Sequence, residues 1–197
     1  MLTGAEARSF FAATRLPQKD ESMSEPLGRG DIRAELDRVR DEFRTLVANS
    51  TPVDLARPSN GTSWTNRELL FHMMFGYLIT RNLRYLFAVM SRAPKRWQRA
   101  FAATLDAATR PFNLVNYWGS RFGGRVLTPE RMARWSDGAI NSLQRSLDAE
   151  ADASLRRDMA FPTRWDPYFK PRMTRQELYH YPTLHFDHHR RQLTIGG

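Results

Sequence analysis

The sequence predicts an all-α protein, an antiparallel four-helix bundle with long crossover connections. Four segments place apolar residues at helical spacing on one face, and two of them open with a capping box. No segment shows the alternating pattern of a convincing strand. The chain has 197 residues, enough for one domain with a core but scarcely enough for two. We therefore predict a tail over residues 1–30 and one bundle domain over residues 31–197.

The first two bundle helices are predicted from their starts and their apolar faces. Asp31 is a good N-cap residue, and apolar residues follow it at helical spacing as far as residue 49. After a loop, the capping box from Thr65 to Glu68 opens a second helix that runs to about Met90. Because this helix is apolar over most of its circumference, we expect it to be central.

A long crossover is predicted between the second and third bundle helices. Residues 96–109 show the amphipathic pattern of a helix, whereas Pro111, Gly119, Gly123 and Gly124 favour an irregular path after it. The third bundle helix begins at Thr128, an N-cap residue followed by proline.

A second irregular connection is predicted over residues 152–173, which are rich in proline and tryptophan. The fourth bundle helix then opens with the capping box from Thr174 to Glu177 and continues to about Leu193. Pro182 lies within this segment, so we expect it to bend the helix or to delay its start.

Composition and charge limit the possible functions. The chain has no cysteine, which excludes disulfides, thiolate zinc sites and a cysteine nucleophile. Its net charge is +9, and residues 92–125 carry most of the excess positive charge. This segment could attract an anionic small-molecule substrate through Arg96, Arg110, Arg121 and Arg125, or it could be a solvated basic face. We expect no nucleic-acid partner, since no such motif is present, and no membrane span or targeting signal, which predicts a cytoplasmic protein.

Three of the five histidines form a candidate metal site. His185 and His189 are four residues apart, so they share one face of the last helix and can point two imidazoles at one ion. His72 lies inside the second helix, where a polar side chain needs a partner, either a metal ion or a hydrogen bond within the core. Three imidazoles with an open fourth position are typical of a catalytic zinc site. Zn²⁺ is expected first, with Ni²⁺, Fe²⁺ or Mn²⁺ as alternatives.

Two motifs resemble the DinB/YfiT-like superfamily of metal-binding four-helix bundles. In one, Trp64 and the capped helix start lead into His72; in the other, residues 185–192 read H-x-x-H-H-x-x-Q. The resemblance spans about residues 31–195 and implies that His72, His185 and His189 are metal ligands. The middle histidine of the second motif, His188, is not a ligand in that pattern, and His180 lies outside it.

The resemblance implies a metal-dependent enzyme that activates an external low-molecular-weight thiol, such as mycothiol or bacillithiol, for S-transfer. One alternative is a hydrolase that uses a metal-bound hydroxide. Another is a non-catalytic bundle, as a monomer or a homodimer, in which the histidine or metal site is structural. Glu68 and Asp187 are either outer hydrogen-bonding partners of the site or solvent-facing residues. No Ser/His/Asp arrangement and no phosphate-binding loop can be identified.

Overall fold

A computed structural model of the protein describes residues 27–195 and confirms the all-α class. Residues 1–26, most of the predicted tail, lie outside the described residues. The elements are α2 (Arg29–Asn49), α3 (Pro52–Ala56), α4 (Asn66–Met90), α5 (Lys95–Ala107), α6 (Thr109–Val126), α7 (Pro129–Ala149), α8 (Asp152–Leu155), β1 (Asp158–Ala160), β2 (Arg172–Thr174) and α9 (Arg175–Arg190).

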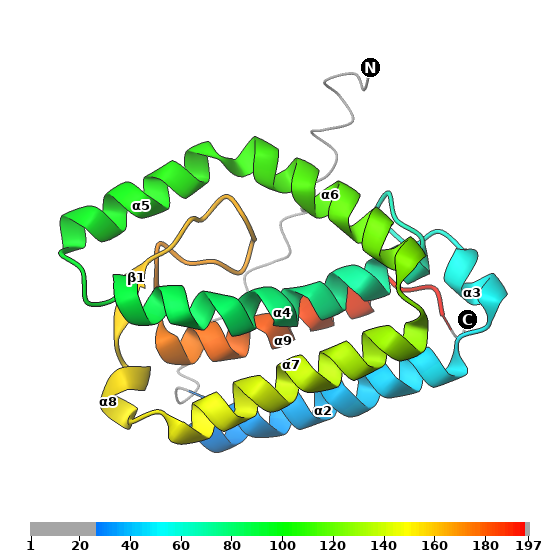
Figure 1. The fold of residues 1–197 in the computed structure, drawn as a ribbon, viewed down its shortest axis with the longest axis horizontal. Coiled ribbons are helices and arrows are strands. Elements are labelled where there is room, and N and C mark those ends of the chain that lie inside the picture. The colour runs from blue at the N-terminus through cyan, green and yellow to red at the C-terminus, as the bar shows by residue number, and fades with distance from the viewer. Residues whose placement is uncertain (1–26, 196–197) are drawn as a thin grey trace, which may run out of the picture.

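Helices α2, α7, α4 and α9 form the four-helix bundle, each packing against two of the others in that cyclic order. Helices α2 and α9 run in one direction and α4 and α7 in the opposite one (Figure 1). Large apolar side chains from all four helices fill the space between them, among them Leu36, Met73, Leu143 and Phe186, each completely buried. Helix α4 also contacts α3 and α6, which confirms its predicted central position.

Side-chain caps begin three of these helices where the sequence predicts them. Thr65 and Thr174 accept hydrogen bonds from the backbone N–H groups of Glu68 and Glu177, at 3.3 and 3.1 Å, and both glutamates complete capping boxes. The Thr128 side chain caps α7 by accepting from the backbone N–H of Arg131, without a capping box. Pro182 lies within α9 and does not delay the start of the helix, so that part of the prediction is wrong.

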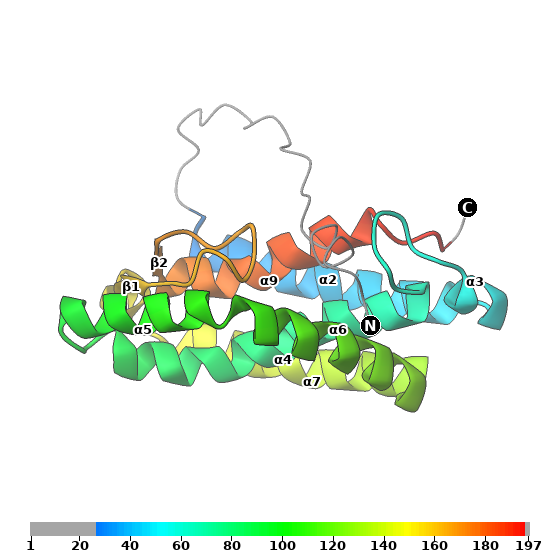
Figure 2. The same ribbon diagram turned by 90° about the horizontal axis from the view of Figure 1, so that it is seen from above.

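The second half of the first crossover is helical, contrary to the irregular path predicted for it. Residues 109–126 form α6, which packs against α4 above the bundle (Figure 2). A Cβ atom on Gly123 would meet the ring of Phe71 at 2.1 Å, and one on Gly124 would lie 2.8 Å from Cα of Glu68. These glycines therefore allow two helices to approach closely rather than break one, a role that local sequence rules do not reveal.

The second connection contains the short helix α8 and two strands, so the prediction of no strand is also wrong. Strands β1 and β2 pair antiparallel, with Met159 opposite Met173. The loop between them folds against α5 and α6, where the Trp165 Nε1–H donates to the Leu105 carbonyl at 2.7 Å. The Trp165 ring also stacks on Phe112, with 4.0 Å between ring centroids. The loop is thereby fixed over one end of α4.

Within residues 27–195, no helix combines the length and the apolar composition that crossing a membrane requires.

Candidate metal centre

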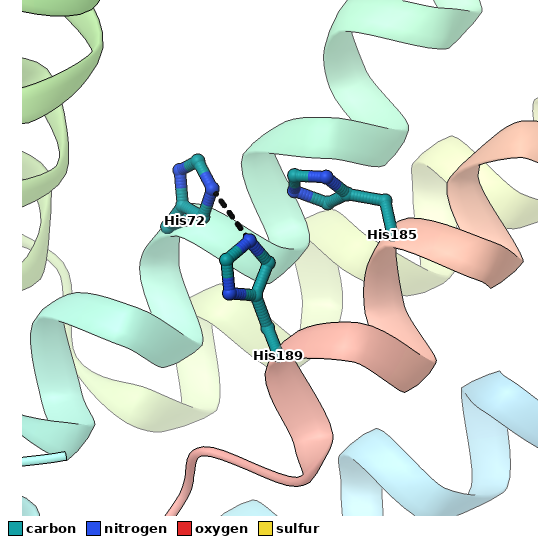
Figure 3. Close-up of side chains that lie close together, drawn as sticks. All are labelled: His72, His185 and His189. Carbon is teal, nitrogen blue, oxygen red and sulfur yellow. Dashed lines mark hydrogen bonds between the residues drawn. The ribbon is translucent and has the colours of Figure 1, made fainter. Parts of the chain in front are cut away.

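The structure brings together the three histidines that the sequence selects as ligands. His72 projects from α4, and His185 and His189 project toward it from consecutive turns of α9 (Figure 3). One nitrogen from each ring lies within 4.8 Å of the other two, and Nε2 of His72 is 3.2 Å from Nε2 of His189. Two ligands at about 2.1 Å from one tetrahedral Zn²⁺ are about 3.4 Å apart, so this spacing fits a shared ion.

Groups outside the triad fix the orientation of the two histidines on α9. The His185 Nδ1–H donates to the carboxylate of Asp166 at 3.0 Å. The His189 Nδ1–H donates to the side-chain carbonyl of Gln192 at 2.6 Å. Because both acceptors require the proton on Nδ1, both Nε2 atoms present a lone pair toward His72.

The ring of His72 is held from three sides. Its Nδ1 is 3.3 Å from the hydroxyl of Ser120 on α6, and Asn116 hydrogen-bonds the same imidazole. The indole of Trp64 packs on it, with 4.5 Å between ring centroids. Helix α6 thus supplies the outer contacts of a residue on α4.

One nitrogen of the triad has no hydrogen-bond partner in the described part of the chain. The Nε2 atom of His185 is buried, and His185 as a residue is only 7% exposed. A single hydrogen bond between His72 and His189 can satisfy those two nitrogens, but it leaves His185 unmatched. A buried acceptor without a partner is unfavourable, and a cation shared by the three lone pairs removes that cost.

The pKa values of two of the three imidazoles are lowered, which favours the neutral form that metal binding requires. Burial, together with the neighbouring rings of His189 and His185, holds the pKa of His72 well below its usual value. Burial and His185 do the same to the pKa of His189. Burial alone would raise the pKa of Asp166, but its interactions with His185 and its hydrogen bonds from Tyr168 and Tyr181 together lower it. Asp166 is therefore ionised and a strong acceptor for His185.

A glycine on α4 makes room for His185. A Cβ atom on Gly76 would lie 3.0 Å from Cδ2 of His185, closer than nearly all Cβ contacts in proteins. Gly76 is one turn beyond His72, so the same helix supplies a ligand candidate and the gap that admits another. The glycine therefore lets a side chain of the neighbouring helix α9 come close to α4.

The remaining histidines interact elsewhere. His180 pairs with Glu35 on α2, with Nδ1 2.7 Å from the carboxylate. His188 lies 3.3 Å from the hydroxyl of Tyr168. The pattern of ligand and non-ligand positions in the last helix therefore agrees with where the side chains point.

The two carboxylates considered from the sequence lie away from the triad. Asp187 accepts two hydrogen bonds from Arg38, at 2.8 and 3.0 Å. Glu68 is buried rather than solvent-facing: it completes the α4 capping box and lies 3.6 and 3.8 Å from Arg121 and Arg125. The carboxylate that does contact the triad, Asp166, was missed because it belongs to the second connection, and no regular spacing links a loop residue to a helix. Gln192 is the last residue of the H-x-x-H-H-x-x-Q motif, but the motif did not predict its hydrogen bond to His189.

A large cavity adjoins the triad. It has a volume of about 1030 Å³ and is lined by all three histidines and by residues of α4, α5, α6, α9 and the loop between the strands. The basic residues Arg96, Arg110, Arg121 and Arg125 are not among its lining residues. An anionic substrate held by that segment therefore finds no support in the shape of the site.

Comparison with known families matches residues 35–193 to the DinB superfamily, a range that covers most of α2, all of α4, α7 and α9, and the three histidines. A search of curated proteins and a search of solved structures each found no match to the chain. The family match, which spans well over half of the chain, establishes that this protein belongs to the DinB superfamily.

Proposed function

We propose that His72, His185 and His189 bind one divalent metal ion through their Nε2 atoms. Zn²⁺ is the first candidate, since a set of three neutral imidazoles suits it well, and Ni²⁺, Fe²⁺ and Mn²⁺ are the alternatives. The observation that carries the proposal is the buried, unpartnered Nε2 of His185 beside the other two converging nitrogens. With three protein ligands, a tetrahedral ion keeps one position for a substrate or cofactor.

We further propose that the protein is a metal-dependent enzyme that activates an external small thiol for S-transfer. The bound ion would supply Lewis acidity that lowers the pKa of a thiol or of water. The chain itself supplies orientation: Asp166 and Gln192 keep the protons of His185 and His189 on Nδ1. The cavity beside the triad supplies space for an electrophile away from bulk water.

Asp166 limits the kinds of hydrolysis that the cavity could support. Among the described residues that line the cavity it is the one carboxylate, and its oxygens already accept hydrogen bonds from His185, Tyr181 and the backbone N–H of Tyr168. Among these lining residues, no carboxylate is therefore free to take a proton from an attacking water. A thiol bound to the ion as its thiolate needs no such base, and neither does a water bound as hydroxide, so metal-dependent hydrolysis is kept as the alternative.

The cavity also bears on the non-catalytic alternative. A site that only cross-links two helices needs no free volume beside it, and structural zinc sites are closed by four protein ligands. Here about 1030 Å³ of space reaches three histidines. This arrangement supports a site that admits a small molecule.

Both S-transfer and hydrolysis require that the three histidines bind a metal ion. Metal analysis of protein purified without a His-tag tests this requirement. We expect about one equivalent of a divalent metal in the wild type and its loss in His189→Ala. The reaction is tested with 1-chloro-2,4-dinitrobenzene as electrophile, with and without mycothiol, bacillithiol or glutathione. Turnover that requires both thiol and metal supports S-transfer, whereas ester hydrolysis without thiol supports the alternative. Less than a tenth of an equivalent in the wild type, after reconstitution with each candidate metal, contradicts both.

A further inference from the structure

The cavity beside the triad has a polar end and an apolar end. Its polar lining is concentrated near the histidines, where Thr62, Ser63, Asn116 and Gln192 lie. Away from them, α4 contributes an apolar stripe at about one-turn intervals, Phe75, Ile79, Leu83 and Phe87. From His72 to Phe87 the helix rises roughly 22 Å at 1.5 Å per residue, so the stripe leads far from the triad.

The walls opposite this stripe are also apolar. Helices α5 and α6 contribute Phe101, Leu105 and Phe112, and the loop between the strands contributes Phe161 and Trp165. We refer to the part of the cavity between these residues and the α4 stripe as the apolar chamber. Trp165 is held by its hydrogen bond to Leu105 and its stacking on Phe112, so this wall is formed without a ligand.

The chamber carries no unpaired charge among the described residues. No lysine, arginine or glutamate lines the cavity, although the chain has 30 cationic residues in all. The one aspartate among the described lining residues, Asp166, lies at the triad, where it accepts hydrogen bonds from His185 and Tyr181. A charged group placed in this chamber would lose its hydration without gaining a partner, which is strongly unfavourable.

We propose that the substrate of this site is an elongated, uncharged and mainly apolar molecule whose reactive polar end meets the triad and whose chain lies in the apolar chamber. The proposal rests on the metal-dependent function proposed above. It assigns the apolar chamber to the electrophile or acyl chain and the polar end of the cavity to the second reactant. It replaces the anionic substrate class suggested by the basic segment with an apolar one.

Alkyl hydroxamates of increasing chain length test this assignment on protein loaded with Co²⁺. The hydroxamate head group binds the metal, and the change in visible absorption reports the dissociation constant. From acetohydroxamate to octanohydroxamate, we expect binding to tighten about fourfold for each added methylene, equivalent to about 0.8 kcal/mol. A carboxylate at the far end of the octano chain is expected to remove most of that gain. A flat chain-length series, or tighter binding of the carboxylate-ended compound, contradicts the proposal.

Two substitutions inside the chamber locate the effect. Ile79→Gln on α4 and Leu105→Gln on α5 are expected to weaken octanohydroxamate binding by about tenfold or more and to leave acetohydroxamate binding unchanged. Val89→Gln is the matched control, because Val89 lies on the same helix as Ile79 but is 69% exposed and outside the cavity lining. Equal losses for the long and the short hydroxamate, or the same loss in the control, contradict the assignment.

A separate arm distinguishes failure of the chamber from failure of the metal site. Binding of hexanol, octanol and decanol to metal-free protein is measured by calorimetry. Affinity that rises with chain length in the wild type and falls in Ile79→Gln supports the chamber even if the protein takes up no metal. Absence of alkanol binding in protein that does hold one equivalent of metal overturns the substrate class and leaves the metal site intact.

Discussion

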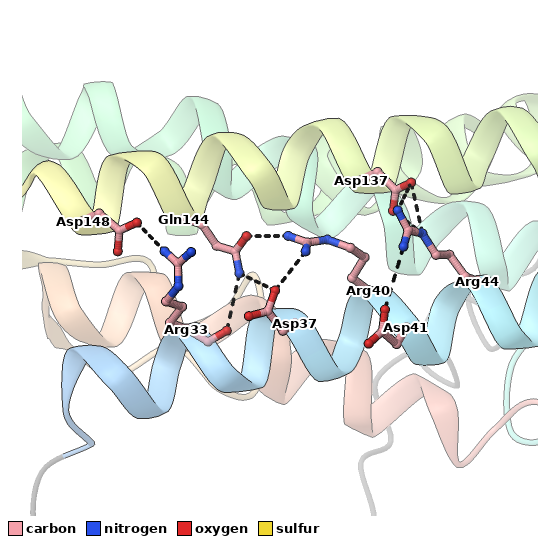
Figure 4. A network of polar contacts seen from close by, with 8 residues as sticks. All are labelled: Arg33, Asp37, Arg40, Asp41, Arg44, Asp137, Gln144 and Asp148. Carbon is pink, nitrogen blue, oxygen red and sulfur yellow. Dashed lines mark hydrogen bonds and ion pairs between the residues drawn. The ribbon is translucent and has the colours of Figure 1, made fainter.

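Polar side chains lie between helices α2 and α7 and between helices α4 and α9, and the two sets differ in how they are hydrogen-bonded. Between α2 and α7, the charged groups are partnered among themselves (Figure 4). Arg44 forms a forked contact with Asp137 at 2.9–3.2 Å, and Gln144 donates to Asp37 at 2.8 Å. Arg33 pairs with Asp148 through a single contact between its Nη1 and one carboxylate oxygen. These groups lie at the edge of the bundle, where solvent reaches most of them.

Between α4 and α9, by contrast, the polar groups are buried and incompletely matched. His72 and His185 are 6% and 7% exposed, and Nε2 of His185 has no partner among the described residues. Every outer nitrogen of the triad is satisfied, whereas the inner nitrogens converge on one point. Charged groups that pair with one another hold helices in place, whereas buried nitrogens that converge on one point, one of them without a partner, favour a further ligand there. This difference supports the proposal that the second contact is the functional one.

Removing one member of the triad should give the largest effect. In His185→Ala, we expect metal affinity to fall by more than about a hundredfold, beyond the usual loss for an outer partner. Metal should then no longer raise the melting temperature, whereas at about 100 times Kd it adds about 2.7 kcal/mol to wild-type stability. Calorimetric metal titration and thermal melts measure both. His180→Ala is the control, because His180 sits on the same helix but pairs with Glu35; a similar loss in that variant contradicts the assignment.

Removing an outer partner should have the next largest effect. Asp166→Asn keeps the shape of the side chain but removes the charge that accepts from His185. We expect metal affinity to fall by about 10- to 100-fold while the fold is retained. Asp158→Asn is the matched control, since Asp158 pairs with Arg172 at the protein surface and should leave metal affinity unchanged. Unchanged metal affinity in Asp166→Asn would show that this carboxylate does not support the site.

A methyl group added at Gly76 should lower metal affinity without lowering the stability of the fold. In Gly76→Ala, the new Cβ would lie 3.0 Å from His185, which must move by a few tenths of an ångström. We expect a roughly tenfold loss of metal affinity, at the low end of the effects of disturbing an outer contact. Helix propensity itself favours alanine by up to about 1 kcal/mol. Gly138→Ala on α7, where a Cβ would meet nothing within 4 Å, should show the gain in melting temperature without the loss of metal binding. Equal metal affinity in both variants contradicts the role given to Gly76.

The sequence predicted the features that depend on local rules. Capping boxes at Thr65 and Thr174 located the starts of α4 and α9, because a cap involves residues only three apart. The pair His185 and His189 followed from helical spacing in the same way. His72 was proposed as the third member because it is a histidine within an apolar helix, and the family resemblance supported this choice, since nothing in its own neighbourhood points to α9.

Features that depend on contacts between distant segments were not predictable in this way. Gly123 and Gly124 resemble helix breakers, yet they are small because α6 packs closely on α4. Asp166 lies in a loop that only the folded chain brings next to His185. The apolar chamber joins three segments whose apolar residues read as ordinary core in the sequence.

The contact between α2 and α7 should give the smallest effect and so completes the comparison. Arg44 and Asp137 have side chains that are 53% and 22% exposed, so water screens much of their attraction. A double-mutant cycle with Arg44→Ala and Asp137→Ala should give a coupling energy of about 0.2–1 kcal/mol, which decreases as salt is added. Metal affinity should be unchanged in all three variants, since neither residue touches the triad. A coupling well above about 1 kcal/mol, or altered metal binding, would mean that the two helix contacts depend on each other and that the polar network does more than hold α2 against α7.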